Sequence, residues 1–505
     1  MLRICLACAL RVRRMAHNGS KWKRLEMEMN LTKRAFLRHL GIGGLAAASG
    51  QVFGDEFVAD SRKLPPGSCG DPRKTYYGKY IFPLEPTMTD GPSCQVVNGE
   101  VVAPARKVPI LHETDVLVIG GGPAGFAAAL AAARTGAKTT LVERYGSLGG
   151  LFTNGMVLLM MATSVRKDGK YRLVTRGICE EFMRRAVAMG DHVARANARP
   201  ESEAHWQPTV DPEGAKYLMD RMIEEAGVKM FFHSWCVDTI QDGNSLRGAV
   251  FASKQGFQAI LAKQVVDCSG DADVLFQAGG NYRQITHAIG YVLRLGNVDR
   301  ISAKASPKDA DGKPLPGKWI LRGNEANEAM WWGNYSLGPK GNGLDVGDLT
   351  QAEIVSRKES WEQVERMRKT PGWEKVFVAS TCSQIGPRAT RLIEAEKIVD
   401  RAAFRSGVRP NDVVGICGAD LPYYEPLYVP YGQLLPKGID NLLCAGRCVG
   451  APDTIDTFRL ICPCFVTGEA AGTAAALSAL GNVRPRDLGV AKLQATLKSH
   501  GACLA

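Results

Sequence analysis

The stretch that decides the fold is residues 115–144, DVLVIGGGPAGFAAALAAARTGAKTTLVER. Residues 116–119 are apolar and favour a strand, Gly120-x-Gly122-x-x-Gly125 follows at once, and an alanine-rich segment predicts a helix running to Gly136. In such a unit the first glycine allows a tight turn, the second lets the backbone approach a pyrophosphate, and the third lets helix and strand pack closely. The order of these parts predicts a dinucleotide-binding α/β fold.

The segment after this helix indicates which nucleotide is bound. KTTLVER predicts a second strand and contains Glu143, which lies 23 residues after Gly120. A carboxylate at this place accepts hydrogen bonds from both ribose hydroxyls and repels a 2′-phosphate, so NADP is disfavoured. The helix N-terminus supplies N–H donors and positive potential for the pyrophosphate.

Three further glycine-bearing segments favour FAD over a nicotinamide dinucleotide. Gly149-Gly150 follows Glu143, Cys268-Ser269-Gly270-Asp271 follows one apolar strand, and Ala445-Gly446-Arg447 follows another. A helix expected from about Thr467 has an N-terminus that can face the cofactor. Each segment alone also suits an ordinary strand-to-helix turn. Together with the first loop they predict four separated contacts along one long cofactor.

These segments resemble the FAD-dependent oxidoreductases of the glutathione-reductase-like Rossmann type. More narrowly, they resemble the bacterial family of FAD-dependent oxidoreductases grouped with the flavin domain of heterodisulfide reductase. The matches keep the family's order from Glu113 to about Leu480, and include VVDCSGDADVLFQAGG, QIGPRATRLIEAEKIV, VPYGQLLPKGIDNLLCAGRCVG and RLICPCFVTGEAAGTAAAL. The closely spaced cysteines of the iron–sulfur cluster in heterodisulfide reductase relatives are missing.

The resemblance implies an oxidoreductase with a tightly bound FAD, and it fixes no particular substrate. We predict Arg144 as one cofactor contact, and the resemblance implies the others: Gly120, Gly122, Gly125, Glu143, Gly149, Gly150, Asp271 and Gly446.

The spacing of the cofactor segments predicts a Rossmann-type FAD-binding domain formed by residues 113–160, 206–280 and 430–505. Residues 161–205 and 281–429 are expected to form an inserted α+β substrate or cap domain, and residues 51–112 an N-terminal extension. The insertions contain no second strand–GxGxxG–helix unit. We therefore expect electrons to come from the substrate itself or from a protein partner, and not through a separate NAD(P)H domain.

Flavin dehydrogenation needs a donor C–H held near the flavin, and often a base for the linked proton. His287 follows the third FAD segment and is a candidate base, although a histidine in an apolar strand also suits the core. Arg388, Arg447 and Arg459 are candidates to hold a carboxylate or to stabilise charge on the flavin. For these arginines, and for Arg391, structural ion pairing is the alternative.

Two further groups of residues are weaker candidates. Cys462-Pro463-Cys464 is expected just before the helix, where the helix dipole lowers a thiol pKa and a redox role is the alternative, but packing is the favoured interpretation. Tyr423, Tyr424 and Tyr428 either line the pocket or fill the core. No cysteine spacing indicates a metal site.

Composition restricts the remaining possibilities. The chain has 505 residues and a net charge of +12, but the first 40 residues alone carry +8, so a nucleic-acid partner is not expected. Residues 1–50 form a basic leader with Lys33-Arg34 ahead of a short apolar run that ends near Ala48. This run is too short to span a membrane and resembles a twin-arginine export signal.

The leader predicts a periplasmic protein that is exported folded with its cofactor. In that case translation starts at Met27 or Met29, residues 1–26 are not part of the protein, and Cys69 and Cys94 are free to pair. An ordinary basic N-terminal helix in a cytoplasmic protein is the alternative.

The leading functional hypothesis is a dehydrogenase or oxidase that takes a hydride from a small organic substrate and passes the electrons to an unidentified acceptor. The alternatives are a flavin monooxygenase and an electron-transfer flavoprotein that works with an iron–sulfur partner.

Overall fold

The computed structural model describes residues 94–196, 206–298, 320–322, 328–335, 341–370, 373–418 and 425–505. The chain divides into two units, Met1–Thr87 and Met88–Ala505, and all of these residues belong to the second. The leader, most of the N-terminal extension, Cys69, Tyr423 and Tyr424 lie outside the described residues. In the part that is described, no helix is both long and apolar enough to cross a membrane.

The first layer is a mixed sheet whose strand order is β10-β11-β12-β3-β4-β9, with β22 paired to β12. Strand β12 joins the parallel and antiparallel parts of this sheet. Its first half pairs antiparallel with β11, and its last three residues pair parallel with β22. It also pairs parallel with β3, which is followed in the sheet by β4 and β9. The strands are β3 (Ile110–Ile119), β4 (Thr139–Val142), β9 (Lys229–Phe231), β10 (Trp235–Asp242), β11 (Ser245–Ser253), β12 (Gly256–Asp267) and β22 (Leu442–Cys444).

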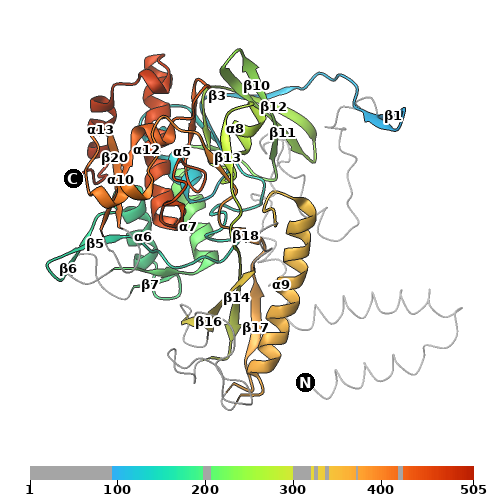
Figure 1. Ribbon diagram of the computed structural model, residues 1–505, viewed down its shortest axis with the longest axis vertical. Helices are drawn as coiled ribbons and strands as arrows, with labels where there is room; N and C mark the ends of the chain where they lie inside the picture. Colours follow the sequence, from blue (N-terminus) through green and yellow to red (C-terminus); the bar gives the residue numbers. More distant parts are fainter. Residues whose placement is uncertain are drawn as a thin grey trace, which may run out of the picture. The chain divides into compact units, whose positions relative to one another are not determined.

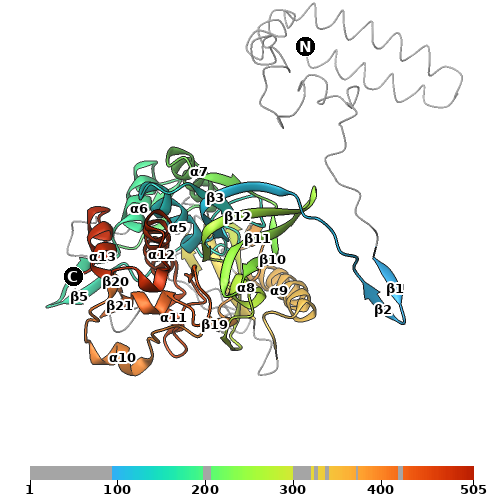
Figure 2. The ribbon, with the colours of Figure 1, turned by 90° about the horizontal axis from the view of Figure 1, so that it is seen from above.

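Two long helices, α5 (Pro123–Arg134) and α12 (Ile461–Gly481), pack closely against each other beside this sheet (Figure 2). Small residues make the approach possible. A Cβ on Gly468 would lie 2.1 Å from the Ala124 carbonyl oxygen, and one on Gly472 would lie 2.0 Å from that of Ala128. The expected helix after the glycine loop is thus confirmed, and Gly136 has a φ of +100° just beyond its end.

Residues 161–196 differ from our expectation of a cap. Helix α6 (Ile178–Ala188) packs against α5, α12 and α7 (Pro212–Glu225). The Phe182 ring lies 5.5–6.0 Å from the rings of Phe126, Phe152 and Phe465. This segment therefore belongs to the core of the dinucleotide-binding domain, because its apolar face completes the aromatic cluster between the helices.

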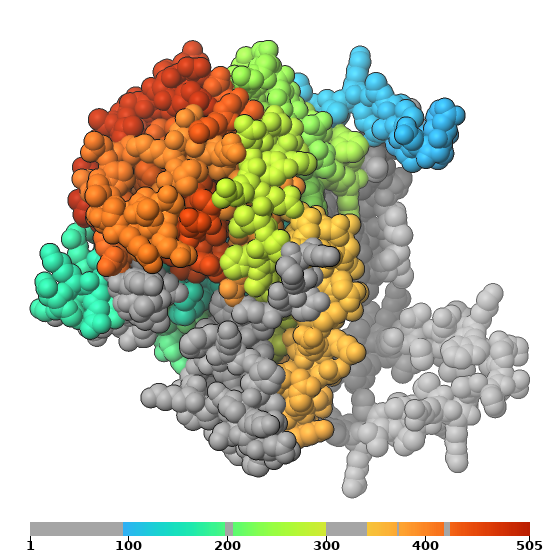
Figure 3. Space-filling view, in the orientation of Figure 1, coloured from blue at the N-terminus to red at the C-terminus, as the bar shows by residue number. Residues whose placement is uncertain are grey.

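A second sheet lies within residues 281–429, the segment that the sequence predicts as part of the cap (Figure 1). Its order is β15-β16-β14-β17, and β18 also pairs with β14. Helix α9 (Val346–Met367) covers this sheet and lies at the surface (Figure 3). The strands are β14 (Ile289–Gly296), β15 (Ile320–Arg322), β16 (Glu328–Tyr335), β17 (Phe377–Thr381) and β18 (Gly386–Pro387).

The remaining elements are short. The two-stranded pairs are β1 (Gln95–Val97) with β2 (Glu100–Val102), β5 (Ser164–Lys167) with β6 (Lys170–Leu173), β7 (Ala194–Arg195) with β8 (Thr209–Val210), β13 (Tyr282–Gln284) with β19 (Arg391–Ile393), and β20 (Val413–Gly418) with β21 (Pro426–Pro430). The helices are α8 (Asp273–Gln277), α10 (Arg401–Ser406), α11 (Ile455–Phe458) and α13 (Val490–Ser499), with 3-10 turns η1 (Tyr431–Leu434) and η2 (Pro485–Asp487). Strand β20 contacts α12, so this part of the expected cap also joins the first domain.

Candidate functional site

The glycine loop between β3 and α5 is shaped by close backbone contacts. Gly120 has a φ of +98°, and a Cβ there would lie 2.4 Å from the Cys268 carbonyl oxygen. A Cβ on Gly125 would lie 1.7 Å from the Gly120 carbonyl oxygen. The fold itself therefore requires both glycines, Gly120 for the turn and Gly125 for the close contact between helix and strand.

Gly122 differs from its two neighbours because no atom of the chain crowds it. It is the N-cap of α5 and has an ordinary extended backbone, and a Cβ there would meet only the Gly150 Cα, at 4.0 Å. Gly122 lines a pocket. The missing side chain leaves room for a ligand at a helix N-terminus, which is where a pyrophosphate binds.

Glu143 lies at the end of β4, as the sequence predicted, and is 5% exposed. Its Oε2 accepts a hydrogen bond from the Gly121 N–H at 2.6 Å, and its Oε1 accepts one from the Tyr145 N–H at 2.9 Å. Burial raises the pKa of this carboxyl in spite of these hydrogen bonds. Each oxygen keeps a second lone pair for a ribose hydroxyl.

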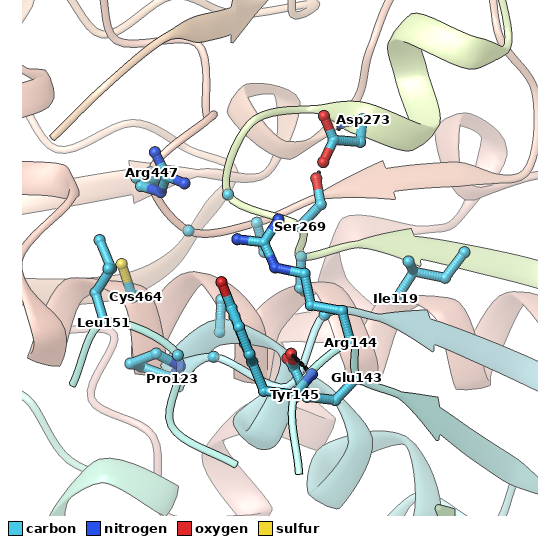
Figure 4. Close-up of a pocket in the computed structure, with 18 of the residues that line it drawn as sticks. Ile119, Pro123, Glu143, Arg144, Tyr145, Leu151, Ser269, Asp273, Arg447 and Cys464 are labelled. Carbon is cyan, nitrogen blue, oxygen red and sulfur yellow. Dashed lines mark hydrogen bonds between the residues drawn. The ribbon is translucent and has the colours of Figure 1, made fainter. Parts of the chain in front are cut away.

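The pocket has a volume of about 910 Å³, counting the space open to solvent at its mouth. In Figure 4, Leu151 and Cys464 lie on one side of it and Glu143 and Arg144 on the other. The Arg144 guanidinium lies 4.9 Å from the ring centres of both Tyr145 and Trp235. Ser234, Trp235 and Cys236 also line the pocket, although none of them was singled out as a contact from the sequence.

Gly149 and Gly150 play different parts. Gly149 has a φ of +103° and donates from its N–H to the Gly121 carbonyl at 2.8 Å, so it fixes the loop. Gly150 lines the pocket opposite Gly122.

Asp271 lies behind the pocket wall. Its Oδ2 accepts from Arg447 Nη2 at 2.7 Å, and its Oδ1 accepts from the Thr390 hydroxyl. Arg447 also donates to the Pro387 carbonyl at 2.9 Å and, with Gly446, lines the pocket. Asp271 therefore orients Arg447, which lines the pocket.

Asp273 is a pocket residue that the sequence analysis missed, since it lies two residues beyond the Gly-Asp turn. Its carboxylate accepts from Arg391 Nη1 at 2.8 Å. Burial, and then the charges of Asp271 and Asp267, raise its pKa to about 6. Arg391 stacks on the Phe276 ring at 4.2 Å and is thus a structural ion-pair partner.

The N-terminus of α12 corrects one expectation. The helix begins at Ile461, so Cys462 and Cys464 lie inside its first turn and are buried. Burial raises the pKa of Cys464 to about 12 and outweighs the lowering effect of Arg447 and Arg459. The burial of both cysteines agrees with packing, the interpretation that the sequence favoured over activation by the helix dipole. Tyr428, on β21, packs against the core.

His287, Arg388 and Arg459 come from three different segments and meet near the Cys464 side. His287 lies in the loop before β14, and not in a strand. Its Nε2 lies 3.0 Å from Asp456 Oδ1, and its Nδ1 accepts from the Ala288 N–H at 2.7 Å. Because a backbone amide only donates, Nδ1 is the acceptor and Nε2 carries the proton given to Asp456.

Arg459 binds the same carboxylate. Its Nε and Nη2 donate to Asp456 Oδ1 at 3.1 and 2.8 Å. Hydrogen bonding from His287 and then from Arg459 holds the pKa of Asp456 far below its usual range. Arg459 lines the pocket. His287 does not line it, and its ring instead contacts Asp456, the carboxylate that holds Arg459.

Comparison with known proteins decides the family. The family model described as FAD dependent oxidoreductase matches residues 115–497. The chain belongs to this family. Its cofactor is accordingly FAD, its reaction class is oxidation and reduction, and the resemblance found in the sequence is confirmed.

Curated relatives match this FAD-dependent oxidoreductase only over short segments. Dihydrolipoyl dehydrogenase of Trypanosoma brucei brucei is 51% identical over 49 residues, 10% of each chain. Leghemoglobin reductase of Glycine max is 40% identical over 70 residues, 13% of each chain. The matches thus span about a tenth of the length of these relatives.

Similar solved structures include a p-nitrophenol 4-monooxygenase from Pseudomonas putida, with a TM-score of 0.43, 11% identity, and coverage of 77% of this chain and 88% of that one. A geranylgeranyl bacteriochlorophyll reductase-like protein from Thermoplasma acidophilum has a TM-score of 0.40, 16% identity, and coverage of 77% and 82%.

The pocket fits FAD on its own geometry. The pyrophosphate would lie at the α5 N-terminus over Gly122, with the adenosine ribose at Glu143 and the flavin toward Leu151 and Cys464. Gln384 lines the pocket, and its buried Oε1 has no hydrogen-bond partner among the described residues. A bound ligand would supply the missing donor.

Proposed function

We propose that this protein is a single-FAD dehydrogenase or oxidase of a small organic substrate. The observation that carries the proposal is that one pocket runs from the nucleotide loop to Arg459, a residue that Asp456 and His287 hold in place. A polar group beside the predicted flavin end is what a substrate site requires.

When bound, FAD supplies a hydride acceptor, and the protein's own residues supply positioning and exclusion of water. Arg447 is fixed by Asp271 and the Pro387 carbonyl at the pocket wall. Arg459 is fixed by Asp456, which is fixed in turn by His287. The apolar side chains of Leu151, Ile461 and Cys464 line the same end and keep it poor in water.

Two observations favour direct reduction by the substrate over a separate nicotinamide domain. In the described residues, one mixed sheet carries one glycine loop of this kind. The second sheet, with α9 on it, has a core of its own formed by Leu293, Leu295, Val364 and Met367. This arrangement supports a cap over one cofactor.

The first test is an absorbance spectrum of the purified protein, followed by identification of the nucleotide released on denaturation. Anaerobic incubation with a panel of alcohols, amines and organic acids then tests for bleaching of the flavin band. Bleaching by a small donor supports the proposal. FAD without bleaching by any donor, together with reduction by a co-purifying iron–sulfur protein, would establish the electron-transfer alternative. Oxygen insertion into a product would establish a monooxygenase.

We also propose that the protein reaches the periplasm as a folded holoprotein. The support is the Lys33-Arg34 segment and the apolar run after it, which lie outside the described residues. Fractionation of cells expressing the full chain and a Lys33→Gln, Arg34→Gln variant tests this. Retention of only the variant in the cytoplasm would support export, and equal cytoplasmic retention of both would refute it.

A further inference from the structure

Gln384 brings an amide without a hydrogen-bond partner to the pocket. It lies between β17 and β18 and lines the same pocket as the glycine loop. Its Oε1 is buried and has no partner among the described residues. A buried acceptor without a donor is unfavourable, so native structures supply the donor from the protein, from water or from a ligand. Because this amide lines a ligand pocket, a bound ligand can supply it.

The main chain around Gln384 is held from two sides. The N–H groups of Ser383 and Gln384 donate to the Asn154 carbonyl at 2.9 and 3.3 Å. The next N–H, that of Ile385, donates to Glu353 Oε1 on helix α9 at 2.9 Å. These hydrogen bonds fix the main chain at Gln384 before any ligand binds, and a group that is fixed in advance loses less entropy on binding.

The position of Gln384 along the pocket follows from its neighbours. Asn154, whose carbonyl accepts from Gln384, lies three residues after Leu151. A Cβ on Gly386, two residues beyond Gln384, would lie 3.6 Å from a methyl carbon of Leu151. Leu151 lines the pocket on the side away from Glu143 (Figure 4). Since the adenosine ribose is expected at Glu143, the flavin ring is expected at the side where Gln384 lies.

Gln384 comes from a different part of the chain than the other residues that line the pocket. Those residues fall within 119–151, 234–236, 268–273 and 445–464. Gln384 belongs to residues 281–429, the segment that also carries the second sheet. A hydrogen bond from a ligand to this amide would therefore join that segment to the cofactor.

The chemistry of the flavin ring matches this amide. The oxidised isoalloxazine ring has a single N–H group, at N3, and carbonyl oxygens on both sides of it. A glutamine amide has an oxygen that accepts and an NH2 group that donates, so it complements this edge of the ring. Hydrogen bonds to the ring nitrogens are one means by which a protein orients a flavin and tunes its reduction.

We propose that Gln384 binds the isoalloxazine ring of FAD, and that its Oε1 accepts a hydrogen bond from the N3–H group of the ring. By this contact the segment that carries the second sheet holds the cofactor. The inference goes beyond the proposed function and does not rest on the identity of the electron donor, because it concerns the FAD that the family binds.

The test compares FAD with 3-methyl-FAD, in which a methyl group replaces the N3 hydrogen. The full chain, freed of its nucleotide, is titrated with each compound, and the quenching of flavin fluorescence gives the two Kd values. We expect the wild-type protein to bind FAD at least about tenfold more tightly than 3-methyl-FAD. Equal affinities, or no binding of FAD, would overturn the proposal without any variant.

Variants assign this preference to Gln384. Gln384→Leu keeps the size of the side chain and removes the acceptor, so it should weaken FAD binding by about tenfold and change 3-methyl-FAD binding by less than about threefold. Gln384→Ala removes the acceptor without placing new atoms in the pocket and should also lose the preference. Gln351→Ala, at an exposed glutamine on α9, is the matched control and should keep it. Thermal unfolding shows that each variant is folded.

Two results with the variants would refute the proposal. A folded Gln384→Leu protein that still prefers FAD by about tenfold would show that another group accepts from N3–H. An unchanged preference together with a raised KM for a donor found in the screen would show that Gln384 contacts the substrate and not the flavin.

Discussion

At the scale of single residues, Gly122 and Gly125 have different purposes: Gly122 leaves room for a ligand, and Gly125 is needed for folding. A Cβ at Gly122 meets nothing closer than 4.0 Å, whereas one at Gly125 would lie 1.7 Å from the Gly120 carbonyl oxygen. We predict that Gly122→Ala folds normally and binds FAD at least about tenfold more weakly, about 1.4 kcal/mol. Titration of the apoprotein with FAD measures the affinity.

Gly125→Ala is the matched comparison, and it should lower the unfolding midpoint because backbone has to move. Loss of folding in Gly122→Ala would contradict this division of roles.

His287 offers a test of positioning against proton transfer. Both of its ring nitrogens are used, by the Ala288 N–H and by Asp456. With a donor found in the screen, His287→Ala should lower kcat/KM by about tenfold through KM, with little change in kcat or in its pH profile. His500→Ala is the control. Loss of about a hundredfold or more in kcat, with loss of one limb of the pH profile, would show instead that His287 is a general base.

Glu469 makes stability depend on pH. This carboxyl is buried on α12, accepts from the Ile178 N–H at 3.0 Å, and has an Oε1 without a hydrogen-bond partner among the described residues. Burial raises its pKa to about 8, compared with 4.5 for the unperturbed group. The folded state therefore holds this proton more tightly than the unfolded state between these values.

The free energy of unfolding contributed by Glu469 should consequently fall as pH rises from about 4.5 to about 8, by up to about 1.4 kcal/mol per pH unit. Glu469→Gln should remove this slope, as measured by denaturant unfolding at pH 5, 6.5 and 8. The exposed Glu213→Gln change should leave it in place. An unchanged slope in Glu469→Gln would show that another group is responsible.

At the scale of elements, the contact between α5 and α12 depends on small residues four apart. Gly472→Ala would place a Cβ 2.0 Å from the Ala128 carbonyl oxygen. We predict a loss of about 1–3 kcal/mol in the free energy of unfolding from this overpacking. Gly481→Ala lies in the same helix, where a Cβ would meet only a Val483 side-chain atom at 3.8 Å.

The Gly481→Ala change should be neutral or stabilising by about 0.5–1 kcal/mol, since alanine loses less backbone entropy in a helix. Thermal or chemical unfolding of both variants gives the comparison. Equal effects would mean that the helices do not approach as closely as described.

The start of α12 shows why an element boundary was misplaced. The sequence predicts Pro463 before the helix, but it lies in the first turn. Proline is tolerated there because the first four N–H groups of a helix have no intrahelical partner. The helix therefore begins six residues earlier than expected and includes the buried Cys464.

At the scale of the whole molecule, the pocket joins segments that lie far apart in the sequence, around Gly122, Glu143, Leu151, Ser269 and Gly446. A ligand that binds all of them only in the folded state must stabilise that state. We predict that free FAD at about 100 times its Kd raises the free energy of unfolding by about 2.7 kcal/mol. Unfolding midpoints of apoprotein and holoprotein test this, and equal midpoints would refute it.

The two sheets are tied together across the molecule. Arg294, on β14, pairs with Asp211 at 3.3 Å, and Asp211 is also the N-cap of α7. The second sheet is thus anchored to the helix α7 that Asp211 caps. The sequence showed no sign of this pairing, since nothing local links residues 83 positions apart.

The sequence by itself determined the nucleotide loop, the acidic residue at the end of β4, the class of cofactor and the family. These features are local: strand, turn and helix signals of fixed spacing, with glycine required wherever backbone approaches backbone or ligand. Only the tertiary structure decided the contacts of Asp271, Asp273, Trp235 and His287 and the packing of the α6 segment. Those contacts depend on which side chains meet after folding, and burial and partner charges at that meeting set the pKa values of the pocket carboxyls.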